Sequence, residues 1–137
     1  MRAHHIAVGC VLALLPGCGG GDSDDPSPAD PELAADLTVL VRKNPDDPGR
    51  KIAIRCEQLG PKASEQPCRG LAGLSREQLA PVPADVACTQ IYGGPSTARV
   101  RGDLHGRPVD ARFELTNGCE IERWDRNRVL LGDPPGG

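Results

Sequence analysis

Aromatic residues are scarce in this chain of 137 residues, which contains one Trp, one Tyr and one Phe. Proteins that bind single-stranded nucleic acid stack bases on several aromatic side chains, so this composition argues against that role. Histidine is also rare, and His105 is the only one outside the first five residues, in a Gly-Arg-Pro context typical of a surface turn. No nucleophile stands beside a base in a recognisable catalytic motif. We therefore expect a protein that is not an enzyme.

The chain also lacks an apolar run long enough to cross a bilayer, which requires about 20 residues. Its N-terminal run, residues 6–15, follows the basic Arg2 and ends before Pro16-Gly17-Cys18. This pattern predicts a signal peptide over residues 1–18. A small residue directly before a cysteine is typical of a bacterial lipoprotein cleavage site, so we expect a lipid on Cys18 as the only membrane contact. Cleavage a few residues further on, which would give a freely secreted protein, remains the alternative.

Residues 19–36 contain no Lys or Arg. Gly, Pro, Ser and Ala fill most positions between the acidic residues, which predicts a disordered acidic tether. The acidic residues of this segment are Asp22, Asp24, Asp25, Asp30, Glu32 and Asp36. Subtracting these six from the 19 acidic residues, and Arg2 from the 16 basic ones, leaves 13 acidic and 15 basic residues. So small a surplus does not indicate nucleic-acid binding.

No C-x-x-C pair is present among the four cysteines that follow the tether, which are Cys56, Cys68, Cys88 and Cys119. Their spacing suits no common zinc module, so we expect no metal and no other cofactor. An even number of cysteines in an exported domain predicts two disulfides instead. Three pairings are compatible with the sequence, and the residues alone do not choose between them.

Two pairs of β-rich segments predict antiparallel hairpins. Residues 37–42 and 51–56 flank a turn-rich segment over residues 44–49. Residues 98–104 and 109–115 alternate between apolar and charged side chains around a turn at residues 105–107. Alternation with a period of two is typical of strands with one face on a core and one in water.

Two further segments are predicted to be helical. Residues 68–79 contain apolar residues at helical spacing, and Ser75 with Gln78 forms a candidate capping box. Residues 119–129 carry Arg123, Arg126 and Arg128, which we expect on a solvated helix face. Together the segments predict an α+β fold: an antiparallel β-sheet with two short helices on one face and two disulfides.

The segment from Ala87 to Pro95 reads Ala-Cys-Thr-Gln-Ile-Tyr-Gly-Gly-Pro. It begins at a cysteine and ends in residues that continue neither a helix nor a central strand. An extended loop tethered at Cys88 can enter a protease cleft in substrate-like form at a low entropy cost. We interpret the chain as a protease inhibitor.

Several motifs together resemble one family, the Streptomyces subtilisin inhibitor-like proteins. They are the order of the cysteines, the segment 88–92, the hairpin after it, and Thr-Asn-Gly-Cys-Glu at residues 116–120. The resemblance covers most of residues 37–131, so residues 37–137 are predicted to be a subtilisin-inhibitor-like domain. It implies the pairings Cys56–Cys68 and Cys88–Cys119, and a homodimer formed through the sheet.

The resemblance also implies a reactive site. The scissile bond would join Gln90, the P1 residue on its acyl side, to Ile91, the P1′ residue. The partner would be a subtilisin-like serine protease outside the cell. Residues expected to contact it around the scissile bond are Cys88, Thr89, Tyr92 and Gly93, with Asn117 as a hydrogen-bonding brace of the loop.

Two features depart from the family pattern. Gln90 replaces the common Met or Lys at P1, and being neutral it cannot pair with a carboxylate at the bottom of a trypsin-like pocket. Gly93 and Gly94 stand where the family usually has one residue between the Tyr and the Pro. They support an alternative function, a surface-anchored binding module that retains the inhibitor fold without inhibiting.

Overall fold

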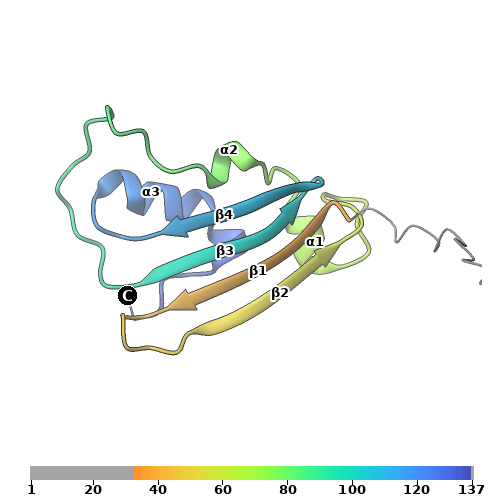
Figure 1. Cartoon of the computed structure of the whole chain (residues 1–137), viewed down its shortest axis with the longest axis horizontal. Coiled ribbons are helices and arrows are strands. Elements are labelled where there is room, and N and C mark those ends of the chain that lie inside the picture. The colour runs from red at the N-terminus through yellow and green to blue at the C-terminus, as the bar shows by residue number, and fades with distance from the viewer. Residues whose placement is uncertain (1–32, 137) are drawn as a thin grey trace, which may run out of the picture.

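The structure, a computed structural model, describes residues 33–136. Its strands are β1 (Ala35–Arg42), β2 (Arg50–Cys56), β3 (Thr97–Leu104) and β4 (Arg107–Phe113). They form one four-stranded antiparallel sheet in the order β2-β1-β3-β4 (Figure 1). The predicted signal peptide, the lipid on Cys18 and the tether up to residue 32 lie outside the described residues.

Alternation places one side of every strand on the core. In the central strand β1, Ala35, Leu37, Val39 and Val41 are buried, and the residues between them lie on the opposite, open face. Both predicted hairpins are present. The hairpin of β3 and β4 turns through His105 and Gly106, which have φ values of 51° and 69°. Positive φ at both positions is the geometry of a two-residue turn that matches the twist of its strands.

The predicted boundaries of β1 and β4 were wrong. β1 begins at Ala35, two residues inside the range assigned to the tether, because Ala35 pairs with both Cys56 and Leu104 and is fully buried. β4 ends at Phe113 and not at Leu115. Leu115 is nevertheless buried, so its apolar side chain carried the alternating pattern beyond the ladder.

Four short helical segments lie on one face of the sheet, where two were predicted (Figure 1). The predicted region 68–79 overlaps α1 (Gln66–Gly70) and α2 (Arg76–Leu79), and the predicted region 119–129 overlaps α3 (Gly118–Arg126) and α4 (Arg128–Leu131). The Ser75 and Gln78 capping box at α2 is confirmed, with both reciprocal hydrogen bonds present. The α+β class is therefore confirmed.

Two of the three aromatic residues form the centre of the core. Phe113 of β4 and Trp124 of α3 are fully buried, and the Trp124 indole N–H donates to the Gly132 carbonyl oxygen at 3.0 Å. That hydrogen bond satisfies the polar edge of a buried ring and joins α3 to the end of α4.

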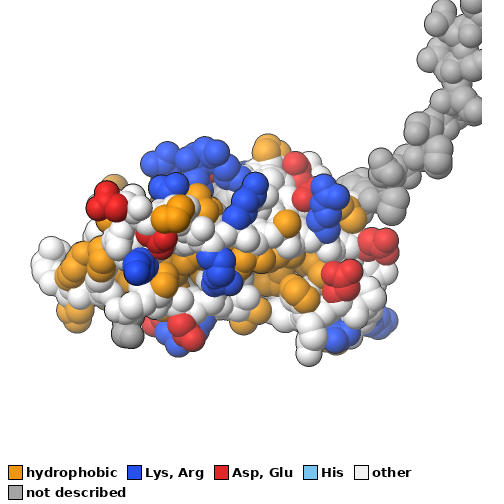
Figure 2. Space-filling model, turned by 90° about the horizontal axis from the view of Figure 1, so that it is seen from below, with side chains coloured by type: hydrophobic (Ala, Val, Ile, Leu, Met, Phe, Trp, Pro, Cys, Tyr) orange, Lys and Arg blue, Asp and Glu red, His pale blue; other side chains and the backbone are white. Residues whose placement is uncertain are grey.

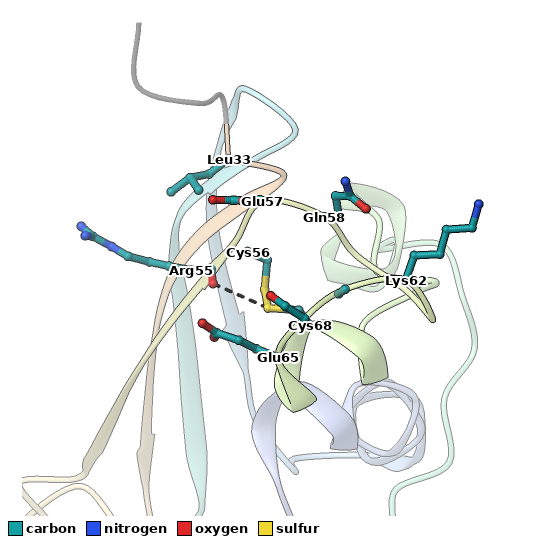
Figure 3. A pocket seen from close by; sticks show the side chains of 10 residues that line it. Leu33, Arg55, Cys56, Glu57, Gln58, Lys62, Glu65 and Cys68 are labelled. Carbon is teal, nitrogen blue, oxygen red and sulfur yellow. Dashed lines mark hydrogen bonds between the residues drawn. A yellow bond between two sulfur atoms is a disulfide. The ribbon is translucent and has the colours of Figure 1, made fainter. Parts of the chain in front are cut away.

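The two disulfides are Cys56–Cys68 and Cys88–Cys119, as the resemblance implied, and they leave none of these four cysteines for zinc. Cys56–Cys68 joins the end of β2 to α1. It lines a hollow of about 440 Å³ that also includes Arg55, Gln58 and Lys62 (Figure 3). The end of β2 and α1, which carry this disulfide, lie at the end of the sheet opposite the segment 87–95 (Figure 1).

Arg123 contradicts the expectation of a solvated side chain, because it is only 3% exposed. Its guanidinium donates to the carbonyl oxygens of Arg112 at 2.7 Å and Leu79 at 2.8 Å, and to the Glu120 carboxylate at 3.0 Å. The guanidinium carbon also lies 4.0 Å from the centroid of the Phe113 ring, a cation–π distance. One side chain thus links α3 to α2 and to the edge strand β4.

We predict that Arg123→Ala lowers the free energy of unfolding by about 3–5 kcal/mol, the range for removing one partner of a buried ion pair. The loss arises because two buried carbonyl groups and Glu120 lose their donor. Urea denaturation measures it. The matched control is Arg126→Ala, three residues further along α3 and exposed, which should change stability by less than about 0.5 kcal/mol. Equal effects of the two substitutions would contradict the linking role of Arg123.

Candidate reactive loop

The segment 87–95 has no helix or strand and runs around one end of the molecule, beside the start of α3 (Figure 1, left). Its only large apolar side chains, Ile91 and Tyr92, are 60% and 64% exposed. Gln90, before them, is exposed as well, and its side-chain amide donates to the Cys88 carbonyl oxygen at 3.3 Å. Adjacent exposed apolar side chains in a small protein are a typical mark of an interaction site.

The loop is held on both sides of these three residues. The Gly118 N–H donates to the Thr89 carbonyl oxygen at 2.9 Å, and the Gly93 N–H donates to the Leu115 carbonyl oxygen at 2.8 Å. The disulfide from Cys88 to Cys119 adds a covalent link on the N-terminal side. All three links end on residues 115–119, the junction between β4 and α3, so one short segment fixes the loop.

The two successive glycines have separate geometric roles. A Cβ on Gly93 would lie 2.9 Å from the Ile121 side chain and 3.1 Å from that of Leu115, so only glycine fits this close approach to α3. Gly94 has a φ of 115°, a conformation that favours glycine, and nothing lies within 4 Å of where its Cβ would be. The first glycine is therefore packed and hydrogen-bonded, and the second turns the chain away from the loop.

Gly118 is a second glycine at which two segments of the chain come close together, here the start of α3 and the loop. A Cβ at this position would overlap the Thr89 hydroxyl oxygen, so a side chain here would displace the loop. In the sequence, Gly118 is visible only as part of the motif at residues 116–120, and no pattern indicates a role for Leu115 or Ile121. The glycine that follows Asn117 was the only sequence signal for the close contact between residues 118 and 89.

Asn117 stands at the same junction. Its side-chain oxygen accepts from the Glu120 N–H at 3.0 Å, which makes it the N-cap of α3. An N-cap of this type typically contributes about 1 kcal/mol to helix stability. The brace of the loop by Asn117 itself stays a prediction, and in the structure the loop's hydrogen bonds come from the backbone of Leu115 and Gly118. Asn117 supports the loop by fixing the start of the helix that holds it.

Residues 33–136 offer few other candidates for a catalytic, metal-binding or membrane-spanning role. His105 is exposed in its turn, as expected. Within this range no group of three or more His, Cys, Asp or Glu side chains is arranged to hold a metal ion. No helix in the described part of the chain is long and apolar enough to cross a membrane. The homodimer through the sheet stays a prediction.

Comparison of the chain with models of protein families, with curated proteins and with solved structures found no match in any of the three. Loop geometry and the sequence motifs are therefore the features that point to a function.

We predict that Gly118→Ala loosens the loop because its Cβ would displace Thr89. Amide hydrogen exchange of residue 118 should accelerate at least about tenfold, which corresponds to about 1.4 kcal/mol of lost protection. The double variant Gly118→Ala/Thr89→Ala removes the overlapping hydroxyl and should restore most of the protection.

Gly73→Ala is the matched control for the glycine change. Only the end of the Gln78 side chain lies within 4 Å of its added Cβ, at 3.8 Å. Exchange at residue 118 should not change in this variant. Slow exchange in Gly118→Ala itself would mean that the contact with Thr89 does not hold the loop.

Proposed function

We propose that this protein is an exported serine protease inhibitor that presents the Gln90–Ile91 bond to a subtilisin-like protease in the manner of a substrate. The observation that carries the proposal is the attachment of the loop on both sides of that bond. Thr89 is held by Gly118 before the bond and Gly93 by Leu115 after it, while the residues between them project into solvent. The motif resemblance to the subtilisin inhibitor-like family agrees with this assignment.

Docking would place the Gln90 carbonyl carbon against the catalytic serine of the protease. The oxyanion hole of the protease would accept the carbonyl oxygen, as it does for a substrate. Since the loop is already ordered by the disulfide and two backbone hydrogen bonds, docking costs little conformational entropy. The exposed Gln90 side chain has to break only its hydrogen bond to the Cys88 carbonyl oxygen.

The complex would persist because the two new chain ends stay in place after the protease cuts the Gln90–Ile91 bond. The new carboxyl end at Gln90 stays attached through Cys88 to Cys119, and the new amino end at Ile91 stays attached through Gly93 to Leu115. Both ends remain beside each other, so religation competes with release. Gly93 of the glycine pair is itself one of the attachment points, which supports the arrangement.

Export is supported by the sequence and by the two disulfides, because disulfides persist in oxidising compartments. A lipid on Cys18 with the acidic tether would hold the inhibitor outside the cell at the membrane surface. Processing further along the chain would instead release it.

Titration of subtilisin with the purified protein tests the proposal. Residual activity should fall linearly to near zero at an equimolar ratio, and mass spectra should show mostly intact chain or one cut after Gln90. The variant Cys88→Ala/Cys119→Ala should be cleaved and released, because the N-terminal end of the cut loop is no longer bound covalently.

Each other outcome has a defined meaning. Full protease activity with accumulating fragments would make the protein a substrate. Full activity with an intact chain would favour the non-inhibitory binding module. Equal inhibition by the variant without Cys88 and Cys119 would overturn the role of that disulfide.

A second prediction tests the assignment of P1. Gln90→Lys should strengthen inhibition of trypsin at least about tenfold, because a lysine ammonium pairs with the carboxylate in the trypsin pocket. The matched control is Gln58→Lys, an exposed position in the hollow beside the Cys56–Cys68 disulfide (Figure 3). Inhibition constants for trypsin measure both variants. No gain in Gln90→Lys, or an equal gain in the control, would show that Gln90 is not the P1 residue.

A further inference from the structure

The open face of the sheet carries a hollow near the end of β1 and the start of β3. Its volume is about 410 Å³. Four arginines line it, together with a single carboxylate: Arg42 from β1, Arg99 and Arg101 from β3, Arg112 from β4, and Glu114. Figure 2 shows Lys and Arg side chains gathered along the upper margin of the molecule in that view.

Neighbouring carboxylates neutralise only part of this charge. Asp110 pairs with Arg99 at 2.6 Å and with Arg101 at 3.5 Å. The hydrogen bond from Arg99 lowers the pKa of Asp110 to about 2, so this pair stays ionised at neutral pH. Among residues 33–136, no carboxylate lies within 4 Å of the guanidinium nitrogens of Arg42 or Arg112.

The strand register makes the excess charge unfavourable in the absence of a counterion. Arg112 stands directly opposite Arg99 in the pairing of β4 with β3. Like charges at directly opposed positions of an antiparallel pair destabilise a sheet. A neutral residue at position 112 would remove this opposition and leave the pairing of Arg99 with Asp110 intact.

Arg42 lines the hollow with a side chain that is partly buried. Its Nε is buried and has no hydrogen-bond partner among the described residues. A buried donor without an acceptor costs about 1–3 kcal/mol. The Nε of Arg123 in the core is buried without a partner in the same way, so the site depends on the charge of Arg42 and of the surrounding arginines.

We propose that this hollow is a binding site for a phosphate-type oxyanion, either free or as the phosphate group of a larger ligand. The planar guanidinium group matches two oxygens of a phosphate, and Arg42 and Arg112 are the two cations left without a carboxylate. Arg99, held by Asp110, contributes a third positive group in fixed orientation. The site does not depend on protease inhibition, and the proposed loop residues are not part of it.

Isothermal titration calorimetry with inorganic phosphate, against sodium chloride at equal ionic strength, tests the site. Phosphate should bind the protein measurably more tightly than chloride. Arg112→Gln and Arg42→Gln should each weaken phosphate binding about tenfold, the effect of losing one charge-assisted hydrogen bond. Arg107→Gln is the matched control, an exposed arginine at the turn between β3 and β4, and should change the affinity less than about twofold.

A parallel arm identifies the source of the phosphate. Sedimentation with vesicles of phosphatidylglycerol in phosphatidylcholine, against phosphatidylcholine alone, shows whether a lipid headgroup occupies the hollow. Binding in either arm that is lost in Arg42→Gln and Arg112→Gln supports the site and names its source. Three outcomes would overturn it: no binding in either arm, an equal loss in Arg107→Gln, or binding that appears only after the acidic residues 22–32 are replaced by amides. The last outcome would mean that the chain's own acidic segment fills the hollow.

Discussion

The buried guanidinium of Arg123 is the interaction on which the loop geometry depends. It takes the carbonyl oxygens of Leu79 and Arg112 as acceptors and lies over the Phe113 ring. Through these contacts α3 is fixed against both α2 and the edge strand β4. Residues at the start of α3 hold the loop, so a shift of this helix would move every attachment point of the candidate scissile bond.

The junction between β4 and α3 performs several tasks within five residues. Leu115 accepts a hydrogen bond from the loop, Asn117 caps the helix, Gly118 permits the close approach of Thr89, and Cys119 closes the disulfide. Apart from the covalent disulfide, none of these contacts is strong alone. Their common origin in one segment means that ordering the junction orders both ends of the loop together.

Much of the fold could be predicted from the sequence because its strands are amphipathic. Leu37 and Val39 in β1 flank the polar Thr38, and Ala111 and Phe113 in β4 flank Arg112, so this alternation identifies the core face. The division of the C-terminal helical segment into α3 and α4 could not be predicted from such a pattern. Asn127, which ends α3 and precedes α4, is fixed by tertiary contacts, since its side chain donates to the carbonyl oxygens of Gln78 and Arg123.

The candidate site was predictable only in part. The residues that project from the loop, Gln90 to Tyr92, follow from the motif, and the structure places them in solvent. The roles of Gly93 and Gly118 depend on the distance between segments far apart in the chain, which no local pattern contains. Arg123 was misassigned for a related reason: helix periodicity placed it with Arg126, and only the facing carbonyl groups of other elements explain its burial.

The scarcity of aromatic residues has a practical consequence. The single Trp124 is fully buried between the helices and the sheet, whereas the single Tyr92 projects from the loop. Each ring therefore reports on a different part of the protein. Tryptophan fluorescence follows the integrity of the core, and the tyrosine signal follows the surroundings of the loop, so the two processes can be observed separately without attaching a dye.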